Sequence, residues 1–181
     1  MDDNQRKAVR RQRALCYAQQ RLWRGERTRL LSALNILDYY RNKEVFFNVQ
    51  ADFRGRIYPE AEVISYQGSD WIRSLWEFER GKEITDKRCA DWLYVHAANC
   101  YGLARKPYEY RIDFIRTRMG LWRTLCAEPT ECIQIIGEAE DPFRFLAAIR
   151  EVVAYDQHGP GYVSHIPVQI DASSQAIQLW G

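Results

Sequence analysis

The stretch Ile166-Pro167-Val168-Gln169-Ile170-Asp171 alternates apolar and polar residues. This period of two predicts a β-strand that carries its three aliphatic side chains on one face. Asp171 then projects from the opposite face, at the end of the strand. Residues 172–175 predict a turn, and residues 176–180 predict the opening of a helix. A carboxylate in this position is either a turn residue or an oxygen ligand for a hard cation such as Mg²⁺.

A second informative stretch, Asp52-Phe53-Arg54-Gly55-Arg56-Ile57-Tyr58, lies far upstream. Gly55 allows the backbone to turn tightly between its two flanking arginines. The planar guanidinium groups of Arg54 and Arg56 match the geometry of phosphate oxygens. Two interpretations remain open for these arginines. They contact a phosphate backbone, or they belong to a buried ion-pair network in which Asp52 orients a guanidinium group.

Helical periodicity dominates the rest of the chain. In the first 40 residues, apolar side chains recur at three- and four-residue spacing, which predicts one long helix or two joined near Gly25. Four further helices are predicted, with start signals at Asp70, Thr85, Pro107 and Asp141-Pro142. Strands are predicted at 45–49, 57–58 and 63–66, which are rich in β-branched and aromatic residues. Together these elements predict a mixed α/β (α+β) fold.

The composition is that of a globular chain of one domain or slightly more, with 181 residues, 46% hydrophobic and 28% charged. No run of 18 apolar residues and no signal-peptide pattern occurs, so neither a membrane span nor a membrane partner is expected. The predicted location is the cytoplasm. The five cysteines are odd in number and show no C-x-x-C spacing, which favours reduced thiols over disulfides or a zinc site.

The charge is distributed unevenly along the chain. Residues 1–30 carry nine Lys and Arg against three Asp and Glu, a net charge of +6. The remaining residues carry 17 against 21, a net charge of −4. This asymmetry is typical either of contact with a polyanion or of a solvated basic helix face.

The two quoted stretches together resemble single-subunit DNA-dependent RNA polymerases of bacteriophages and mitochondria. Asp52–Tyr58 resembles the D-x-R-G-R-h-Y element of that family, where h is a hydrophobic residue. Asp171-Ala172-Ser173-Ser174-Gln175-Ala176-Ile177-Gln178 resembles its motif A, D-G-S-x-S-G-I-Q-H. Lesser landmarks follow the family's order between these anchors: Ser65–Gly68, Gly81-Lys82, His96–Cys100, Pro107, Arg111-Ile112 and Asp141–Phe143.

This resemblance implies a right-hand polymerase architecture. Residues 1–42 are expected to form a basic thumb-like helical segment, and residues 43–181 the first part of a palm that ends at motif A. In the family, the fingers, motif B and the second catalytic Asp follow motif A. The chain is therefore expected to be either a truncation or one subunit of a split enzyme. Its initiating Met, with a helix directly behind it, favours the small chain of a split, heterodimeric phage RNA polymerase. Its interface with the second subunit should be apolar and on the order of 2,000 Å² or more.

The resemblance also implies the chemistry, which is template-directed nucleotidyl transfer from nucleoside triphosphates to an RNA product on a DNA template. Asp171, with the backbone carbonyl of Ala172, is expected to bind Mg²⁺ and to serve as a catalytic residue. The nucleic-acid and substrate contacts are expected from Arg54, Gly55, Arg56, Tyr58, Arg105 and Lys106. On a thumb, the N-terminal arginines Arg6, Arg10, Arg11 and Arg13 would lie along the phosphate backbone.

Motif A departs from the family pattern at four positions, with Ala172, Gln175, Ala176 and Leu179 in place of Gly, Ser, Gly and His. This drift supports an alternative function, a non-catalytic nucleic-acid-binding scaffold derived from a polymerase palm. A free-standing metal-dependent phosphodiesterase is a further alternative. It would require a second carboxylate of this chain near Asp171, such as Asp52 or Asp156.

Overall fold

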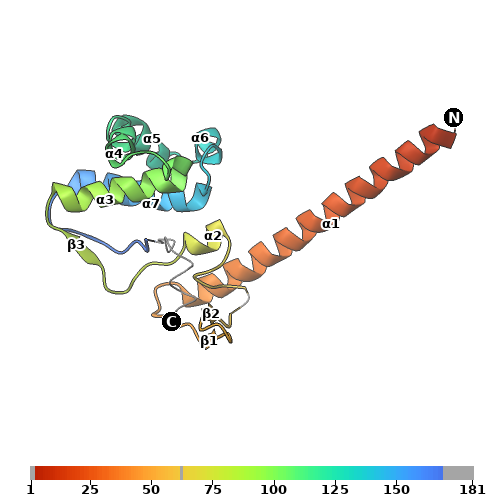
Figure 1. Cartoon of the computed structure of the whole chain (residues 1–181), viewed down its shortest axis with the longest axis horizontal. Coiled ribbons are helices and arrows are strands. Elements are labelled where there is room, and N and C mark those ends of the chain that lie inside the picture. Colours follow the sequence, from red (N-terminus) through yellow and green to blue (C-terminus); the bar gives the residue numbers. More distant parts are fainter. Residues whose placement is uncertain (1–2, 62, 169–181) are drawn as a thin grey trace. The chain divides into compact units, whose positions relative to one another are not determined.

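In the computed structural model, which describes residues 3–61 and 63–168, the first element is one uninterrupted helix, α1 (Asp3–Tyr40) (Figure 1). The helix continues through Gly25, so the first of the two predicted arrangements is correct. A single glycine costs only about 1 kcal/mol in a helix interior, and the surrounding Ala, Leu, Arg and Gln residues are strong helix formers. The chain divides into two units, residues 1–65 and 66–181, which are described separately below.

In the first unit, α1 is followed by a β-hairpin. Strand β1 (Val49–Ala51) pairs antiparallel with β2 (Ile57–Pro59), and Gln50 lies opposite Tyr58. The predicted turn at Arg54-Gly55-Arg56 is thereby confirmed. The strand expected at 45–49 begins only at Val49, and the described residues of 63–66 form no strand.

The second unit contains most of the helices. Its elements are α2 (Asp70–Arg73), β3 (Lys82–Ile84), α3 (Lys87–Ala98), the π-helical turn η1 (Asn99–Leu103), α4 (Tyr108–Arg116), α5 (Met119–Ala127), α6 (Ile133–Gly137), α7 (Pro142–His158) and β4 (Tyr162–Ser164). Helix α7 packs against α3, α5 and α6, and α4 packs on α3 (Figure 1). Strands β3 and β4 pair antiparallel, with Glu83 opposite Val163. Helices with two small antiparallel sheets confirm the α+β class.

The core of the second unit is formed where α3, α4, α5 and α7 meet. Its largest fully buried side chains are Trp122, Phe145, Ile115, Leu125, Ile149 and Val152. The indole N–H of Trp122 donates a hydrogen bond of 2.8 Å to the backbone carbonyl of Ile115. The helix predicted to start at Pro107 does not continue as one element, because the chain breaks at 117–118 into α4 and α5. The break allows Trp122 of α5 to pack against α4, where its indole N–H reaches the carbonyl of Ile115.

The C-terminal strand is displaced from its predicted position. Strand β4 ends at Ser164, and residues 165–168 lie outside any strand, so the described part of the strand expected at 166–171 is wrong. Pro167 has no backbone N–H to donate to a ladder, which disfavours pairing there. The Glu151 carboxylate of α7 accepts hydrogen bonds from the hydroxyls of Tyr162 and Ser164 and so fixes β4.

No helix among the described residues is long and apolar enough to span a bilayer. The division at residue 65 follows the compact units of the structure. The division expected at residue 42 concerns thumb and palm, and it stays a prediction.

Candidate nucleic-acid interface

The turn between β1 and β2 is organised by Asp52. Its carboxylate Oδ1 accepts hydrogen bonds from the backbone N–H groups of Arg54, at 2.8 Å, and Arg56, at 2.9 Å. The Asp52 backbone N–H donates to the carbonyl of Arg56, and the Gly55 N–H donates to the carbonyl of Asp52. Gly55 has a φ of +74°, a conformation that costs other residues about 1–2 kcal/mol. The sequence therefore builds a turn with four internal hydrogen bonds.

This arrangement leaves both guanidinium groups at the surface. Arg54 and Arg56 are exposed, and no carboxylate among the described residues lies within ion-pair distance of either. The buried ion-pair network and the guanidinium contact expected of Asp52 are therefore wrong, because the carboxylate is engaged by backbone N–H groups. The Arg54 guanidinium lies 5.1 Å from the ring centroid of Phe53, which is itself 92% exposed. Two cations and an aromatic ring on a hydrogen-bonded turn can bind phosphate and stack on a base.

Tyr58 lies on β2, on the same hairpin, and its side chain is 38% exposed. The structure thus brings together four of the predicted contact residues: Arg54, Gly55, Arg56 and Tyr58.

Arg105 and Lys106 belong to the second unit, between η1 and α4. Both are exposed, and the Lys106 backbone N–H donates to the carbonyl of Leu103 at 2.9 Å. The Lys106 ammonium lies 5.7 Å from the ring centroid of Tyr110. The short connection from Gly102, whose φ is +107°, places both cations just before the N-terminus of α4. That position has the positive electrostatic potential of a helix start.

Asp171 and Ala172 lie outside the described residues. Within 3–61 and 63–168, no three His, Cys, Asp or Glu side chains are grouped as a metal site. The oxygen donors expected for Mg²⁺ are a carboxylate and a backbone carbonyl, which suit this hard cation.

Sequence reasoning missed a charged network at the start of α7. Asp141 was predicted to cap this helix, yet its side chain makes no cap hydrogen bond. The Asp141 carboxylate instead binds Arg144 at 2.7 Å and Arg73 at 3.4 Å. Asp70 supplies the cap by accepting from the backbone N–H groups of Phe143 and Arg144, at 2.7 and 3.1 Å. The pair Asp141-Pro142 signals the helix start in the sequence, but no local pattern signals the distant partner.

Beside this network lie two buried groups that could suggest nucleophilic chemistry. Cys100 Sγ is 3.8 Å from His96 Nε2, and both side chains are buried. Burial and the nearby charge of Arg144 lower the pKa of His96 to about 4, and burial raises the pKa of Cys100 to about 11. Both groups are therefore neutral at pH 7, which argues against a thiolate–imidazolium pair. His96 is a core histidine.

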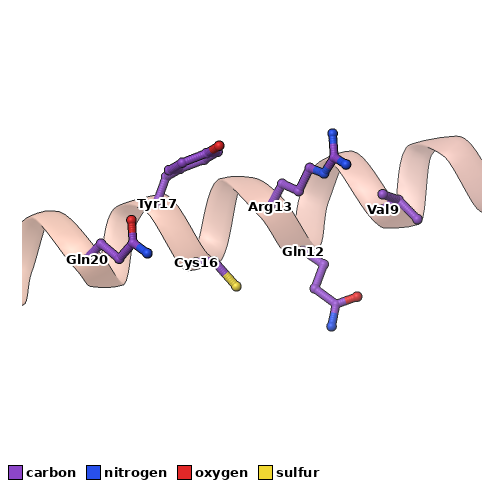
Figure 2. A pocket seen from close by; sticks show the side chains of 6 residues that line it. All are labelled: Val9, Gln12, Arg13, Cys16, Tyr17 and Gln20. Carbon is purple, nitrogen blue, oxygen red and sulfur yellow. The ribbon is translucent and has the colours of Figure 1, made fainter.

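Helix α1 also carries a shallow hollow on its surface. Its lining is Val9, Gln12, Arg13, Cys16, Tyr17 and Gln20, all from the same helix. Figure 2 shows Arg13 and Tyr17 projecting to one side and Gln12 and Cys16 to the other. The hollow thus lacks converging groups and is a weaker candidate than the hairpin.

Comparison with known proteins gives a consistent result. A family model described as DNA-dependent RNA polymerase matches residues 83–180. The mitochondrial DNA-directed RNA polymerase of Schizosaccharomyces pombe is 33% identical over 147 residues, which cover 80% of this chain and 13% of that protein. T7 RNA polymerase of Escherichia phage T7 is 30% identical over 172 residues, covering 94% and 19%. The human mitochondrial enzyme is 33% identical over 173 residues, covering 94% and 14%. The chain thus spans less than a fifth of each of these relatives.

Proposed function

The chain belongs to the DNA-dependent RNA polymerase family, and from this premise we propose that it is one part of a split enzyme that synthesises RNA on a DNA template. Residues 1–42 would supply a thumb-like helix, and residues 43–181 the first part of the palm. The observation that carries the proposal is the hairpin turn, whose internal hydrogen bonds leave Arg54 and Arg56 available to an external anion.

In this function the hairpin binds the phosphate backbone of the template or of the growing RNA. Asp52 accepts hydrogen bonds from two backbone N–H groups of the loop, so the backbone of the turn needs little ordering when phosphate binds. Such contacts orient the nucleic acid without reading its sequence. Arg105 and Lys106 would attract the triphosphate of the incoming nucleotide.

We assign the metal site to Asp171 and the backbone carbonyl of Ala172. Bound Mg²⁺ would supply stabilisation of the negative charge that develops on the reacting phosphate. A second carboxylate is needed for a two-metal centre, and the two candidates of this chain are engaged elsewhere. Asp52 accepts from the backbone of its own turn, and Asp156 forms an ion pair with Arg123. This supports a source of the second acid outside residues 1–181, and in our proposal a partner chain with the fingers supplies it.

The surface of α1 also supports a partner. Leu15, Leu22 and Trp23 are 64–71% exposed, although large apolar side chains are favoured in contact with other apolar groups. They would pack against the remaining polymerase.

The second candidate is a nucleic-acid-binding scaffold without catalysis, favoured by the four altered positions of motif A. Substitution in the assembled enzyme separates the two. Asp171→Asn should reduce RNA synthesis by at least about 100-fold, while template binding changes less than about twofold, because a metal ligand acts on the reaction and not on the phosphate backbone.

Asp156→Asn is the matched control, since it removes a carboxylate that is paired with Arg123. It should retain most of the synthesis. Normal RNA synthesis by Asp171→Asn would refute the catalytic assignment and leave the scaffold. Loss of synthesis with Asp156→Asn alone would instead favour an in-chain acid.

A further inference from the structure

Helices α3 and α4 present an aromatic surface to solvent. Trp92 is 62% exposed and Tyr108 is 52% exposed, and their ring centroids lie 5.5 Å apart with an interplanar angle of 80°. An edge-to-face pair of this kind leaves ring faces open for a further flat partner. Neither side chain contributes to the core of the second unit, because both are largely exposed to solvent.

Arg111 lies behind this pair and is only 8% exposed. Its guanidinium carbon is 4.3 Å from the ring centroid of Tyr108, and its Nη1 donates a hydrogen bond of 2.7 Å to Asn99 Oδ1. Its Nε is buried and has no hydrogen-bond partner among the described residues. Within the same residues, no carboxylate lies within ion-pair distance of Arg111. A buried cation without an anion is costly, so this position favours an anionic ligand nearby.

The net charge around Trp92 and Tyr108 also favours an anionic ligand. Residues 87–118, from α3 to just after α4, hold seven Lys and Arg against three Asp and Glu, a net charge of +4. Residues 119–168 hold three against seven, a net charge of −4. Arg88 precedes Trp92 by one helical turn, on the same side of α3. The acidic Asp91 is neutralised by Arg116 at 2.8 Å.

We propose that Trp92, Tyr108 and Arg111 form a binding surface for single-stranded nucleic acid, distinct from the hairpin of the first unit. An unpaired base stacks on the exposed indole, and the flanking phosphates are attracted by Arg111 and Arg88. Duplex nucleic acid does not suit this surface, because its bases already stack on one another. The combination of stacking rings and cations is typical of proteins that bind single strands with little sequence preference. The proposal requires neither Asp171 nor a metal.

The test uses the full chain and an oligouridylate of about 10 nucleotides, within the usual site size for such proteins. Trp92→Ala should weaken binding about tenfold, equivalent to about 1.4 kcal/mol, because one stacking contact is lost. Trp92→Phe keeps a ring and should stay within about threefold of the wild type. Phe143→Ala is the matched control, because Phe143 is 53% exposed on α7, outside the surface. It should leave the affinity unchanged.

Cross-linking separates this surface from other basic segments such as α1. With 5-iodouracil in the oligonucleotide, the cross-linked peptides should include Trp92 or Tyr108. Asp171→Asn should give the same pattern, so that failure of the catalytic proposal would not affect this result. The proposal would be overturned if the cross-links were confined to other segments, or if Trp92→Ala and Phe143→Ala bound with equal affinity. Either result would indicate that another polypeptide covers this aromatic surface.

Discussion

The carboxylate of Asp70 accepts a hydrogen bond of 2.7 Å from the backbone N–H of Phe143, so a residue of α2 caps a helix that begins 72 positions later. Two orphan N–H groups at the start of α7 are satisfied in this way, and the negative charge lies at the positive end of the helix. The contact ties α2 to the longest helix of the second unit.

Removal of this cap should destabilise the second unit. Asp70→Ala is expected to lower the free energy of unfolding by about 1–2 kcal/mol, because two backbone donors at the start of α7 lose their acceptor. Denaturant unfolding of the full chain measures the change. Glu131→Gln, at an exposed position, is the control and should shift the midpoint little. Equal stability of Asp70→Ala and the wild type would show that water replaces the carboxylate at no cost.

Local sequence signals predicted the elements that depend on local contacts. The turn at Gly55 was predicted because only a flexible residue fits there, and Asp141-Pro142 marked the start of α7. The β3–β4 pair was missed, because each strand has only three residues and is stabilised by a partner about 80 positions away in the sequence, so neither carries a local signal. The break between α4 and α5 was missed for a similar reason, because it depends on Trp122 reaching the carbonyl of Ile115.

The candidate site was predictable only in part. Exposure of Arg54 and Arg56 could not be read from the sequence, because Asp52 could pair equally well with a guanidinium or with backbone N–H groups. The burial of Arg111 had no sequence signal, since an arginine in a helix is ordinarily a surface residue. Asp171 stays a prediction from motif A.

The hairpin arginines should determine how nucleic-acid binding responds to salt. Arg54→Gln and Arg56→Gln should each reduce the slope of log affinity against log salt concentration by about 0.7–0.9, because one phosphate contact is lost. Filter binding across a salt series measures the slope. Arg80→Gln removes an exposed arginine of the second unit and should leave the slope unchanged. A uniform loss for all three variants would indicate a general charge effect instead of a hairpin contact.

Gly55 should tolerate Asn better than Ala. A Cβ at this position meets no atom within 4 Å, so the cost of a substitution is the positive φ alone. Gly55→Ala should weaken the hairpin by about 1–2 kcal/mol, and Gly55→Asn by less, because Asn adopts this region more readily. Amide hydrogen exchange in β1 and β2 reports the difference. Gly120→Ala, in α5 and also in open space, should not be destabilising. Equal exchange in both Gly55 variants would contradict the role of φ.

Acid should destabilise the second unit through His96. Its pKa is lowered to about 4 from 6.5, chiefly by burial and then by Arg144, with Asp141 opposing. As the pH falls below 6.5, the unfolded chain takes up this proton first, so stability decreases between about pH 6.5 and 4. The loss amounts to at most about 3 kcal/mol. His96→Gln should flatten this part of the stability–pH curve, whereas His158→Gln, at an exposed position, should keep it. A parallel slope in both variants would assign the acid sensitivity to carboxylates.

The contact between α7 and β4 offers a spectroscopic test. Burial, together with the charge and the hydrogen bond of Glu151, raises the pKa of Tyr162 to about 12. Glu151→Gln removes the negative charge, so the pKa of Tyr162 should fall toward its ordinary value of 10. Ultraviolet titration, with Tyr162→Phe to identify the signal, measures the shift.

The same substitution should also speed amide exchange in β4, because Ser164 loses its carboxylate partner. Glu138→Gln is the matched control, since Glu138 accepts a hydrogen bond of 2.9 Å from the hydroxyl of Tyr101. It removes the same carboxylate charge beside a different tyrosine, Tyr101, and should leave both the pKa of Tyr162 and the amide exchange of β4 unaffected. If Glu151→Gln changed neither the titration nor the exchange, β4 would be held by its pairing with β3 and not by α7.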